Sequence, residues 1–304
     1  MNRMMLGFIV VAGLACTRLG AAQAADSAPP APAVTVSGAV TGLQAWNGAV
    51  TGGQVDWSSA TITGTVKRQF VPAFSASLTL TYNDEYWGFA SSTADVIPSF
   101  WGRLQRPAVG LNFGLALSPT ILLGIGPSAE WPAAPGVDAD DALTYGATFS
   151  ALKVFSPKFV LGAGVNTFRQ FYNVKNSPFV IINWKLTDRL KIANAFPAGP
   201  EGGAGVELRY APDKRWEFAG GGVWRSSRFR LADDGPYARQ VGEMSCIPLF
   251  GRATRNLGAK TRVDLYAGAL VNGSLKVKDD DGRDIENETW GTSPALALTL
   301  SQKF

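Results

Sequence analysis

Charged side chains at alternate positions in the second half of the chain are the residues best placed to do chemistry. Alternation puts them on the polar face of extended segments. Such a set could favour anions if it lines a narrow channel, or it could pair internally and keep the interior of the fold rigid, which is the favoured interpretation. The basic members are Lys185, Lys191, Arg209, Arg215, Arg225 and Arg262, and the acidic members are Glu207, Glu217 and Asp264.

The composition gives little support to catalysis. The 304 residues include no histidine, so the commonest general base and a principal metal ligand are absent. No pair of carboxylates is singled out by its spacing for acid and base work. We therefore expect a protein that is not an enzyme and uses no cofactor. The net charge of +4 does not call for a nucleic-acid partner.

The densest acidic run, residues 279 to 288, resembles part of a calcium-binding loop. With Gly282 as the central glycine, Asp279, Asp281 and Glu288 fall at three ligand positions. Val277, however, occupies the first ligand position, so the EF-hand pattern is incomplete. We expect no metal here and regard the loop as a weak candidate. A solvated acidic loop is the better interpretation, and a surface loop that binds divalent ions is the alternative.

Residues 1 to 24 have the pattern of a secretory signal peptide. A short basic region contains Arg3, an apolar stretch runs from Met4 to Ala15, and Ala22-Gln23-Ala24 offers small residues for cleavage. We expect cleavage after Ala24. An Ala/Pro-rich spacer then covers residues 25 to 33, and a single domain covers residues 34 to 304.

The two cysteines have different expected fates. Cys16 leaves with the signal peptide, so the exported chain keeps only Cys246 and cannot form an internal disulfide. We expect Cys246 to pack as a small apolar residue. A lipoprotein acylated at Cys16 is less well supported, because Gly13 stands where leucine is usual in that motif.

Alternation of apolar and polar residues with a period of two dominates the body of the chain. From Phe74 to Tyr82, aromatic and aliphatic residues fall on one face, and Ser or Thr on the other, without exception. The pattern recurs at 111–117, 143–149, 180–186, 206–210 and 263–271. Nowhere after residue 25 is there an apolar run of the roughly 18 residues that a membrane helix needs. The chain is therefore predicted to be all-β.

Very short turns alternate with longer polar connections along the chain. The short turns are at 71–73, 118–120, 156–158, 187–189, 212–214 and 256–260, and the longer connections at 83–106, 132–140, 173–177, 197–203, 232–239 and 272–293. This arrangement is typical of antiparallel hairpins whose two ends face different compartments. We predict a transmembrane β-barrel with short periplasmic turns and longer extracellular loops. A soluble sandwich is the alternative.

Aromatic residues gather near both kinds of connection. Such gathering is expected of rings at the two interfaces of a membrane. The rings near the short turns are Phe70, Phe74, Phe155, Phe159, Trp184, Tyr210 and Trp216, and those near the longer connections are Tyr86, Trp87, Trp131, Tyr172, Trp224 and Trp290.

The last residues resemble the terminal strand of Gram-negative outer-membrane β-barrels. Phe304 ends the chain and Leu300, Leu298 and Leu296 share one face, although Gln302 stands where an apolar or aromatic residue is more usual. Less specifically, the body is similar to an uncharacterised proteobacterial outer-membrane barrel family of unknown function. The resemblance implies a location in the cell outer membrane, with its lipid and lipopolysaccharide as surroundings. It also implies export and barrel-assembly machinery as partners.

Strand direction bounds the number of strands. If Phe304 lies on the periplasmic side, an odd number of strands runs from residue 59 onward, whereas a closed barrel normally has an even number. The segment from Val34 to Trp46 supplies the missing strand and gives about 14 strands. About 12 remain if that segment folds into the lumen as a plug. We expect a passive, porin-like pore or a structural barrel; the alternative is a loop-based binding or adhesion protein with a closed lumen.

Overall fold

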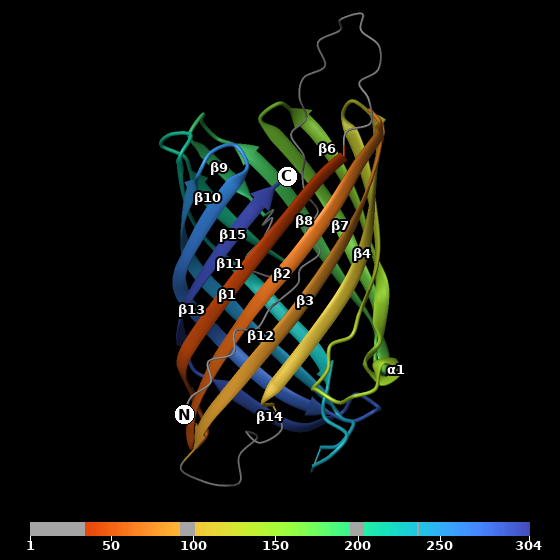
Figure 1. The fold of residues 1–304 in the computed structure, drawn as a ribbon, viewed down its shortest axis with the longest axis vertical. Helices are drawn as coiled ribbons and strands as arrows, with labels where there is room; N and C mark the ends of the chain where they lie inside the picture. Colours follow the sequence, from red (N-terminus) through yellow and green to blue (C-terminus); the bar gives the residue numbers. More distant parts are fainter. Residues whose placement is uncertain (1–33, 92–100, 195–203, 236) are drawn as a thin grey trace, which may run out of the picture.

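The computed structural model describes residues 34–91, 101–194, 204–235 and 237–304. Antiparallel strands wind around one axis and close into a barrel (Figure 1). The predicted signal peptide and spacer lie outside the described residues, and so does the whole of the 197–203 connection. In the described part of the chain, no helix is long and apolar enough to cross a membrane.

The strands follow one another around the wall in chain order. Closure comes from β15, which pairs with both β1 and β13. The strands are β1 (Val34–Val50), β2 (Gly53–Val71), β3 (Phe74–Ser91), β4 (Arg103–Ser118), β5 (Ile121–Glu130), β6 (Thr144–Ser156), β7 (Phe159–Gln170), β8 (Asn173–Lys185), β9 (Leu190–Ala193), β10 (Ala204–Tyr210), β11 (Trp216–Arg230), β12 (Val241–Asn256), β13 (Thr261–Lys278), β14 (Asp284–Trp290) and β15 (Ser293–Lys303).

Two of these elements form a single strand of the wall. The first part of β13 pairs with β15, and its remainder, from Gly273 to Lys278, pairs with β14. β14 and β15 therefore lie end to end, and the barrel has 14 strands, as predicted. Since Val34–Val50 is in the wall as β1, the 12-stranded alternative is not the one that the chain adopts.

The two ends of the barrel differ in their connections. The end that carries the C-terminus, here called the turn end, has the six short turns predicted from the sequence. The opposite end, here called the loop end, carries the remaining connections and the helix α1 (Ala139–Ala142) (Figure 1).

The predicted longer connections are partly wrong. Residues 173–177 belong to β8, which follows a turn of two residues, and the β1–β2 turn at this end is equally short. Much of the predicted 83–106 and 272–293 connections lies in β3, β4, β13 and β14. The physical reason is that strands continue past the apolar band into water. Polar residues there keep their ladder hydrogen bonds, and hydropathy does not distinguish them from a loop.

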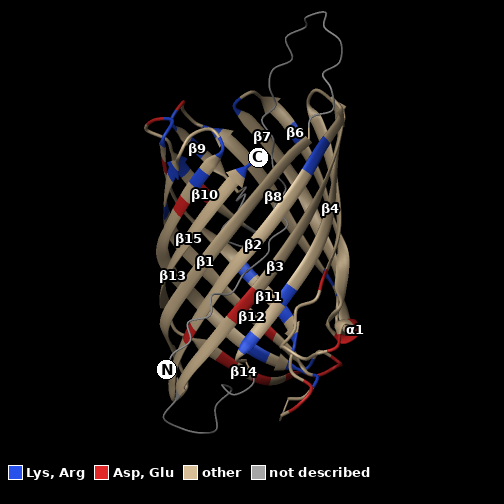
Figure 2. Ribbon diagram, in the orientation of Figure 1, with Lys and Arg blue, Asp and Glu red and all other residues tan. Residues whose placement is uncertain are grey.

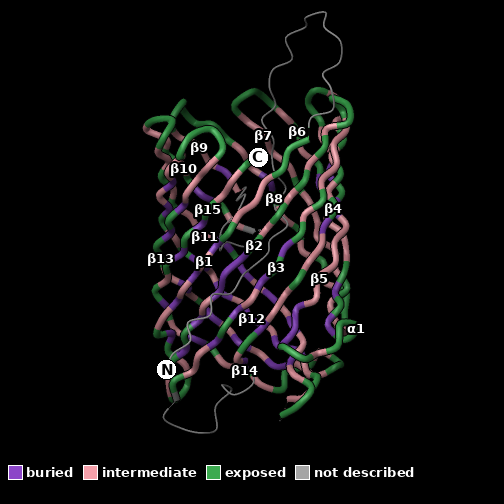
Figure 3. Tube along the Cα trace, viewed as in Figure 1, coloured by how far each residue is buried: buried purple, intermediate pink, exposed green. Residues whose placement is uncertain are grey.

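Apolar residues face outward along most strands. Exposed and less exposed residues alternate in Figure 3, and Leu80, with 54% exposure, alternates with buried Thr81 and half-buried Thr79. A closed wall satisfies every ladder hydrogen bond within lipid, and an apolar outer face matches the bilayer. These are the properties of an outer-membrane β-barrel, and they confirm the predicted fold class and agree with the cell outer membrane as its location.

The outward aromatic side chains only partly follow the two predicted belts. At the turn end, Phe155 lies 5.4 Å from Phe159, which in turn lies 5.6 Å from Trp184, between ring centroids. At the loop end, Tyr86 and Trp224 are exposed on the outer face. Trp87 and Trp290, which were expected to join that belt, are buried instead.

Candidate functional site

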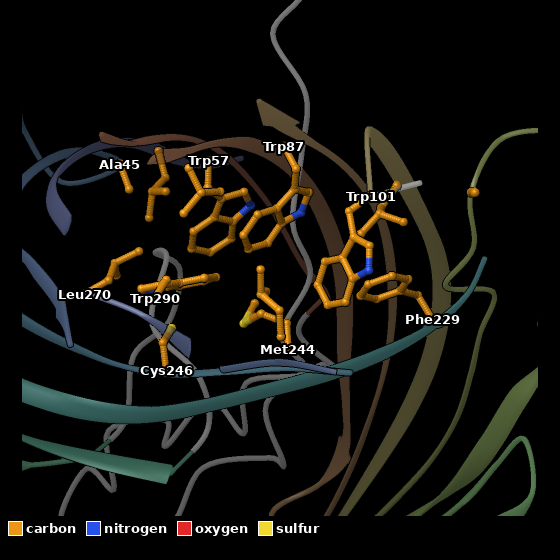
Figure 4. Close-up of a cluster of buried hydrophobic side chains, with 14 of the residues drawn as sticks. Ala45, Trp57, Trp87, Trp101, Phe229, Met244, Cys246, Leu270 and Trp290 are labelled. Carbon is orange, nitrogen blue, oxygen red and sulfur yellow. The ribbon is translucent and has the colours of Figure 1, made fainter. Parts of the chain in front are cut away.

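The lumen of the barrel contains two layers of side chains that differ in chemistry. The layer toward the loop end, here called the aromatic plug, consists of Trp57, Trp87, Trp101, Phe229, Met244 and Trp290 (Figure 4). The layer toward the turn end, here called the ionic layer, consists of Glu207, Arg209, Glu217, Arg252, Thr254, Arg262 and Asp264.

Aromatic side chains of the plug contact one another in a chain that crosses the lumen. Trp57 of β2 stacks on Trp87 of β3 with centroids 5.2 Å apart. Trp101, just before β4, meets Trp87 edge-on at 5.7 Å and Phe229 of β11 edge-on at 4.8 Å. Several strands separate β3 from β11 in both directions around the wall. The plug therefore joins opposite walls of the barrel.

Two glycines make room for the rings of the plug. Trp290 pairs with Gly273 across β14 and β13, and a Cβ added at Gly273 would lie 2.0 Å from its Nε1. A Cβ at Gly242 would lie 2.2 Å from Cε2 of Phe229. Each ring thus lies flat against backbone that carries no side chain, as in the aromatic rescue of a strand glycine.

A buried ion pair also spans the lumen next to the plug. Nη2 of Arg225 on β11 lies 3.4 Å from Oε1 of Glu85 on β3. The Trp57 indole N–H donates to the other oxygen of Glu85 at 3.2 Å, and the Arg225 guanidinium lies 4.6 Å from the centroid of the Trp57 ring. The pair therefore links the plug to both walls by charge as well as by packing.

A short segment crosses the mouth of the lumen at the loop end. Ala133 forms an antiparallel bridge with Gln105 and a parallel bridge with Arg230. The backbone N–H of Gln105 donates to the Ala133 carbonyl at 2.8 Å, and the backbone N–H of Ala134 donates to the Arg230 carbonyl at 2.8 Å. Because Gln105 is on β4 and Arg230 on β11, this segment connects distant parts of the wall on the loop-end side of the plug.

The ionic layer is organised around Arg252, whose side chain is 1% exposed. Its guanidinium lies 2.8 Å from Glu207, 2.9 Å from Glu217 and 3.0 Å from Asp264. Arg209 pairs with Glu207, and Arg262 lies 2.7 Å from Asp264. Three guanidinium groups thus face three carboxylates, all from the adjacent strands β10 to β13. The layer is balanced in charge and lies along one side of the wall.

The structure gathers only some of the nine charged residues singled out from the sequence. Glu207, Arg209, Glu217, Arg262 and Asp264 meet in the ionic layer. Arg225 instead joins the plug through Glu85. The remaining three lie at the turn end: Lys185 pairs with Asp188 at 2.9 Å, Lys191 lies opposite Lys185 in the β8–β9 ladder, and Arg215 is exposed in the turn before β11.

Arg252 is the central residue that the sequence analysis missed. Its strand, β12, has buried Met244 and Cys246 facing the lumen and exposed Leu249 facing outward. Apolar residues therefore occupy both faces, which hides the alternation. The available signal was the parity of Leu249, since Arg252 and Thr254 fall on the opposite face.

Cys246 is a buried free thiol beside the plug (Figure 4), so it packs as a small apolar residue. The three carboxylates of the weak metal candidate are engaged separately. Asp279 accepts the backbone N–H groups of Asp281 and Arg283, and Glu288 accepts the backbone N–H and hydroxyl of Thr51. Asp281 pairs with Arg283 at 3.1 Å. Among the described residues, no group of three such side chains could hold a metal ion.

The residues of the terminal strand lie as the resemblance implies. Leu296, Leu298 and Leu300 are exposed on the outer face, and Phe304 is 71% exposed at the turn end. The Phe304 amide donates to the Val36 carbonyl of β1 at 2.9 Å. Recognition of this strand by assembly machinery stays a prediction.

Comparison with known proteins finds similarity of structure but not of sequence. No protein-family model and no curated protein matches the chain. An outer-membrane channel from Pseudomonas putida F1 has 11% identity, a TM-score of 0.45 and coverage of 93% of this chain and 100% of that chain. The Pseudomonas putida toluene transporter TodX has 11% identity, a TM-score of 0.42 and coverage of 90% of each chain. Pseudomonas aeruginosa OprD has 8% identity, a TM-score of 0.33 and coverage of 89% of this chain and 95% of that chain. These similarities are remote, so what those proteins transport implies nothing about the present chain.

Proposed function

We propose that the protein is a passive outer-membrane channel, without a catalytic centre, whose lumen is closed by its own aromatic plug. The observation that carries this proposal is the contact between opposite walls, of Trp101 with Phe229 and of Arg225 with Glu85. A conducting pore needs a continuous water-filled path, and these contacts interrupt it. Passage of a solute therefore requires the plug to move.

Some hydrogen-bond donors of the plug have no partner among the described residues. They support a plug that can open, and not one that fills the lumen permanently. The indole N–H groups of Trp87, Trp101 and Trp290 are buried without an acceptor among the described residues. A buried donor without a partner costs about 1 to 3 kcal/mol. Water or a solute could pair with these groups once the plug loosens, which lowers the cost of the open state. Apolar solutes that carry an acceptor atom suit such a path better than hydrated ions do.

The ionic layer is expected to remain in place in both states. Its three guanidinium groups and three carboxylates are already paired with one another. We therefore expect at most a weak anion preference in the open channel, set by Lys185, Lys191 and Arg215 near the turn end.

Conductance in planar bilayers tests the proposal. We expect rare openings of the wild-type protein and frequent openings of Trp87→Ala, which removes the ring that contacts three other indoles. Trp184→Ala is the matched control, because it removes an indole from the outer face; it should behave as wild type. A steadily conducting wild type would contradict the closed plug. Silence of a folded Trp87→Ala protein would favour the structural barrel or the loop-based adhesion protein.

A further inference from the structure

Charged residues are distributed unequally between the two ends of the barrel (Figure 2). At the turn end the described exposed acids are only Asp188 and Asp213, whereas acids predominate at the loop end. The exposed basic residues of the turn end are Arg68, Lys153, Lys158, Lys185, Arg189, Lys214, Arg215, Lys260 and Lys303. The exposed acids of the loop end are Asp56, Asp138, Asp140, Asp141, Asp233, Asp234, Asp280, Asp281 and Asp284, beside Arg103, Arg169, Arg239 and Arg283.

Three basic side chains at the turn end lie over aromatic rings on the outer wall. The Arg68 guanidinium is 4.9 Å from the centroid of the Phe70 ring, and Nζ of Lys153 is 5.2 Å from that of Phe155. The Arg255 guanidinium is 4.6 Å from the centroid of the Trp216 ring. We call Arg68, Lys153, Arg255 and these rings the cation–aromatic belt.

All members of the belt share the lipid-facing parity of their strands. Arg68 alternates in phase with exposed Val66, and Lys153 with exposed Phe149. Arg255 is in phase with exposed Leu249, and its ring partner Trp216 with exposed Phe218. The belt thus stands where the apolar band of the wall ends, at the level of lipid headgroups.

Two of the three cations of the belt have no carboxylate partner in the described part of the chain. Neither Arg68 nor Lys153 has a salt bridge to a described carboxylate. The third cation, Arg255, lies near Asp213 in the β10–β11 turn: the backbone N–H groups of Trp216 and Arg215 lower the pKa of that carboxyl most, and the charges of Arg215 and Arg255 lower it further. A cation held against an aromatic ring at the edge of an apolar wall is favourably neutralised by an anion from the same layer of the membrane. Phosphate meets this need, because it accepts several hydrogen bonds from guanidinium and ammonium groups.

We propose that the cation–aromatic belt binds the phosphates of anionic phospholipids in the leaflet that surrounds the turn end. The exposed apolar side chains beside the belt are covered by acyl chains in a membrane, so a water-soluble anionic partner could not reach the outer face there. A lipid, by contrast, brings its phosphate to this level with its chains along the wall. The belt would hold the barrel at a fixed depth, independently of whether the lumen opens.

Electron paramagnetic resonance of spin-labelled lipids tests the proposal on the full-length protein in phosphatidylcholine vesicles. The probe is spin-labelled phosphatidylglycerol, compared with spin-labelled phosphatidylcholine, and the readout is the relative association constant of each lipid with the protein. We expect wild type to prefer phosphatidylglycerol, by about fivefold for each basic side chain that contacts it. The variant R68Q/K153Q/R255Q should lose most of that preference.

The matched control removes three basic residues from the loop end. R169Q/R239Q/R283Q changes the net charge equally but leaves the belt intact, so it should keep the preference. Excess inorganic phosphate should reduce the preference only as much as a neutral salt of equal ionic strength, because the bound phosphate belongs to a lipid. Heat-modified gel mobility confirms folding, and the single variant R68Q serves if the triple variant fails to fold. Equal association of both lipids with wild type, or equal losses in the two triple variants, would overturn the proposal.

Discussion

The two layers of the lumen differ in which strands supply their side chains. The ionic layer takes its side chains from four adjacent strands, β10 to β13, so its contacts run along one part of the wall. The aromatic plug takes its side chains from distant strands, so its contacts run across the lumen. The position of a strand around the barrel therefore decides what its lumen-facing side chains do. Side-chain contacts between neighbouring strands stabilise the wall. Side-chain contacts between distant strands bridge the lumen and block the passage through it.

The largest effect is expected from Arg252→Ala in the ionic layer. Removal of this guanidinium leaves Glu207 and Asp264 buried with reduced neutralisation, and breaking such a buried pair costs about 3 to 5 kcal/mol. Denaturant unfolding in detergent, followed by tryptophan fluorescence, measures the loss. Conductance should not rise, because the plug is unchanged.

A rescue experiment sharpens this prediction. Arg252→Met combined with Glu207→Gln, Glu217→Gln and Asp264→Asn removes the charges together and should recover much of the lost stability. An Arg252→Ala protein as stable as wild type would show that the ionic layer contributes little.

The next largest loss of stability is expected from Leu80→Arg on the outer wall, which lies outside both layers and gives a reference for their effects. Leu80 faces lipid, and an arginine near the midplane of the bilayer costs about 2 to 4 kcal/mol. Thr79→Arg should be milder, because Thr79 faces the lumen, where it is hydrogen-bonded to Thr65 at 3.1 Å. Equal losses in the same unfolding assay would mean that the assignment of the two faces is wrong.

Gly273→Ala is expected to have a smaller effect on stability but a specific effect on the plug. The added methyl group would lie 2.0 Å from Nε1 of Trp290, so the indole must shift. Overpacking of this kind costs about 1 to 3 kcal/mol. Channel openings should become more frequent than in wild type. In the control Gly251→Ala, the new methyl group comes no closer than 3.9 Å to its neighbours, and neither quantity should change.

The smallest effect is expected outside both layers, at Asp213 in the β10–β11 turn. Its carboxylate accepts the backbone N–H groups of Trp216 at 2.8 Å and Arg215 at 2.6 Å, which hold its pKa below the ordinary 3.8. A lowered pKa means that the carboxylate stabilises the fold above the ordinary value and loses this contribution as the pH falls through the folded pKa. Asp213→Ala should therefore be slightly less stable than wild type at neutral pH, and the difference should shrink in acid. A difference that is constant down to low pH would assign it to something other than the charge.

The wall of the barrel could be predicted from the sequence because the lipid requires apolar side chains on its outer face. Within the apolar band, residues of the outer face must be apolar, so Leu78 and Leu80 alternate with Thr79 and Thr81 without exception. The ends of the strands followed no such rule. Asn173 and Ser177 continue β8 beyond the apolar band, and polarity alone made them indistinguishable from a loop.

The side chains of the lumen were harder to predict, since their contacts depend on which strands face each other across the barrel. Trp87 and Trp290 lie far apart in the sequence, and the barrel brings their rings to 5.2 Å between centroids. A tryptophan near a membrane interface fits an outward belt equally well, and only the parity of the strand distinguishes the two. Arg252 was missed for a related reason, because the inward-facing Met244 and Cys246 conceal the alternation of β12.

The pairing of β1 with β15 makes one seam out of the beginning and the end of the chain. Thr41 and Thr299, 258 positions apart, meet there through their hydroxyl groups at 2.9 Å. Until this pairing forms, β1 and β15 are both open edges, with N–H and C=O groups that have no partner strand on one side. Any protein that escorts the unfinished sheet must therefore shield two open edges at once. Loss of the β15 pairing would accordingly open the whole cylinder and not one hairpin only.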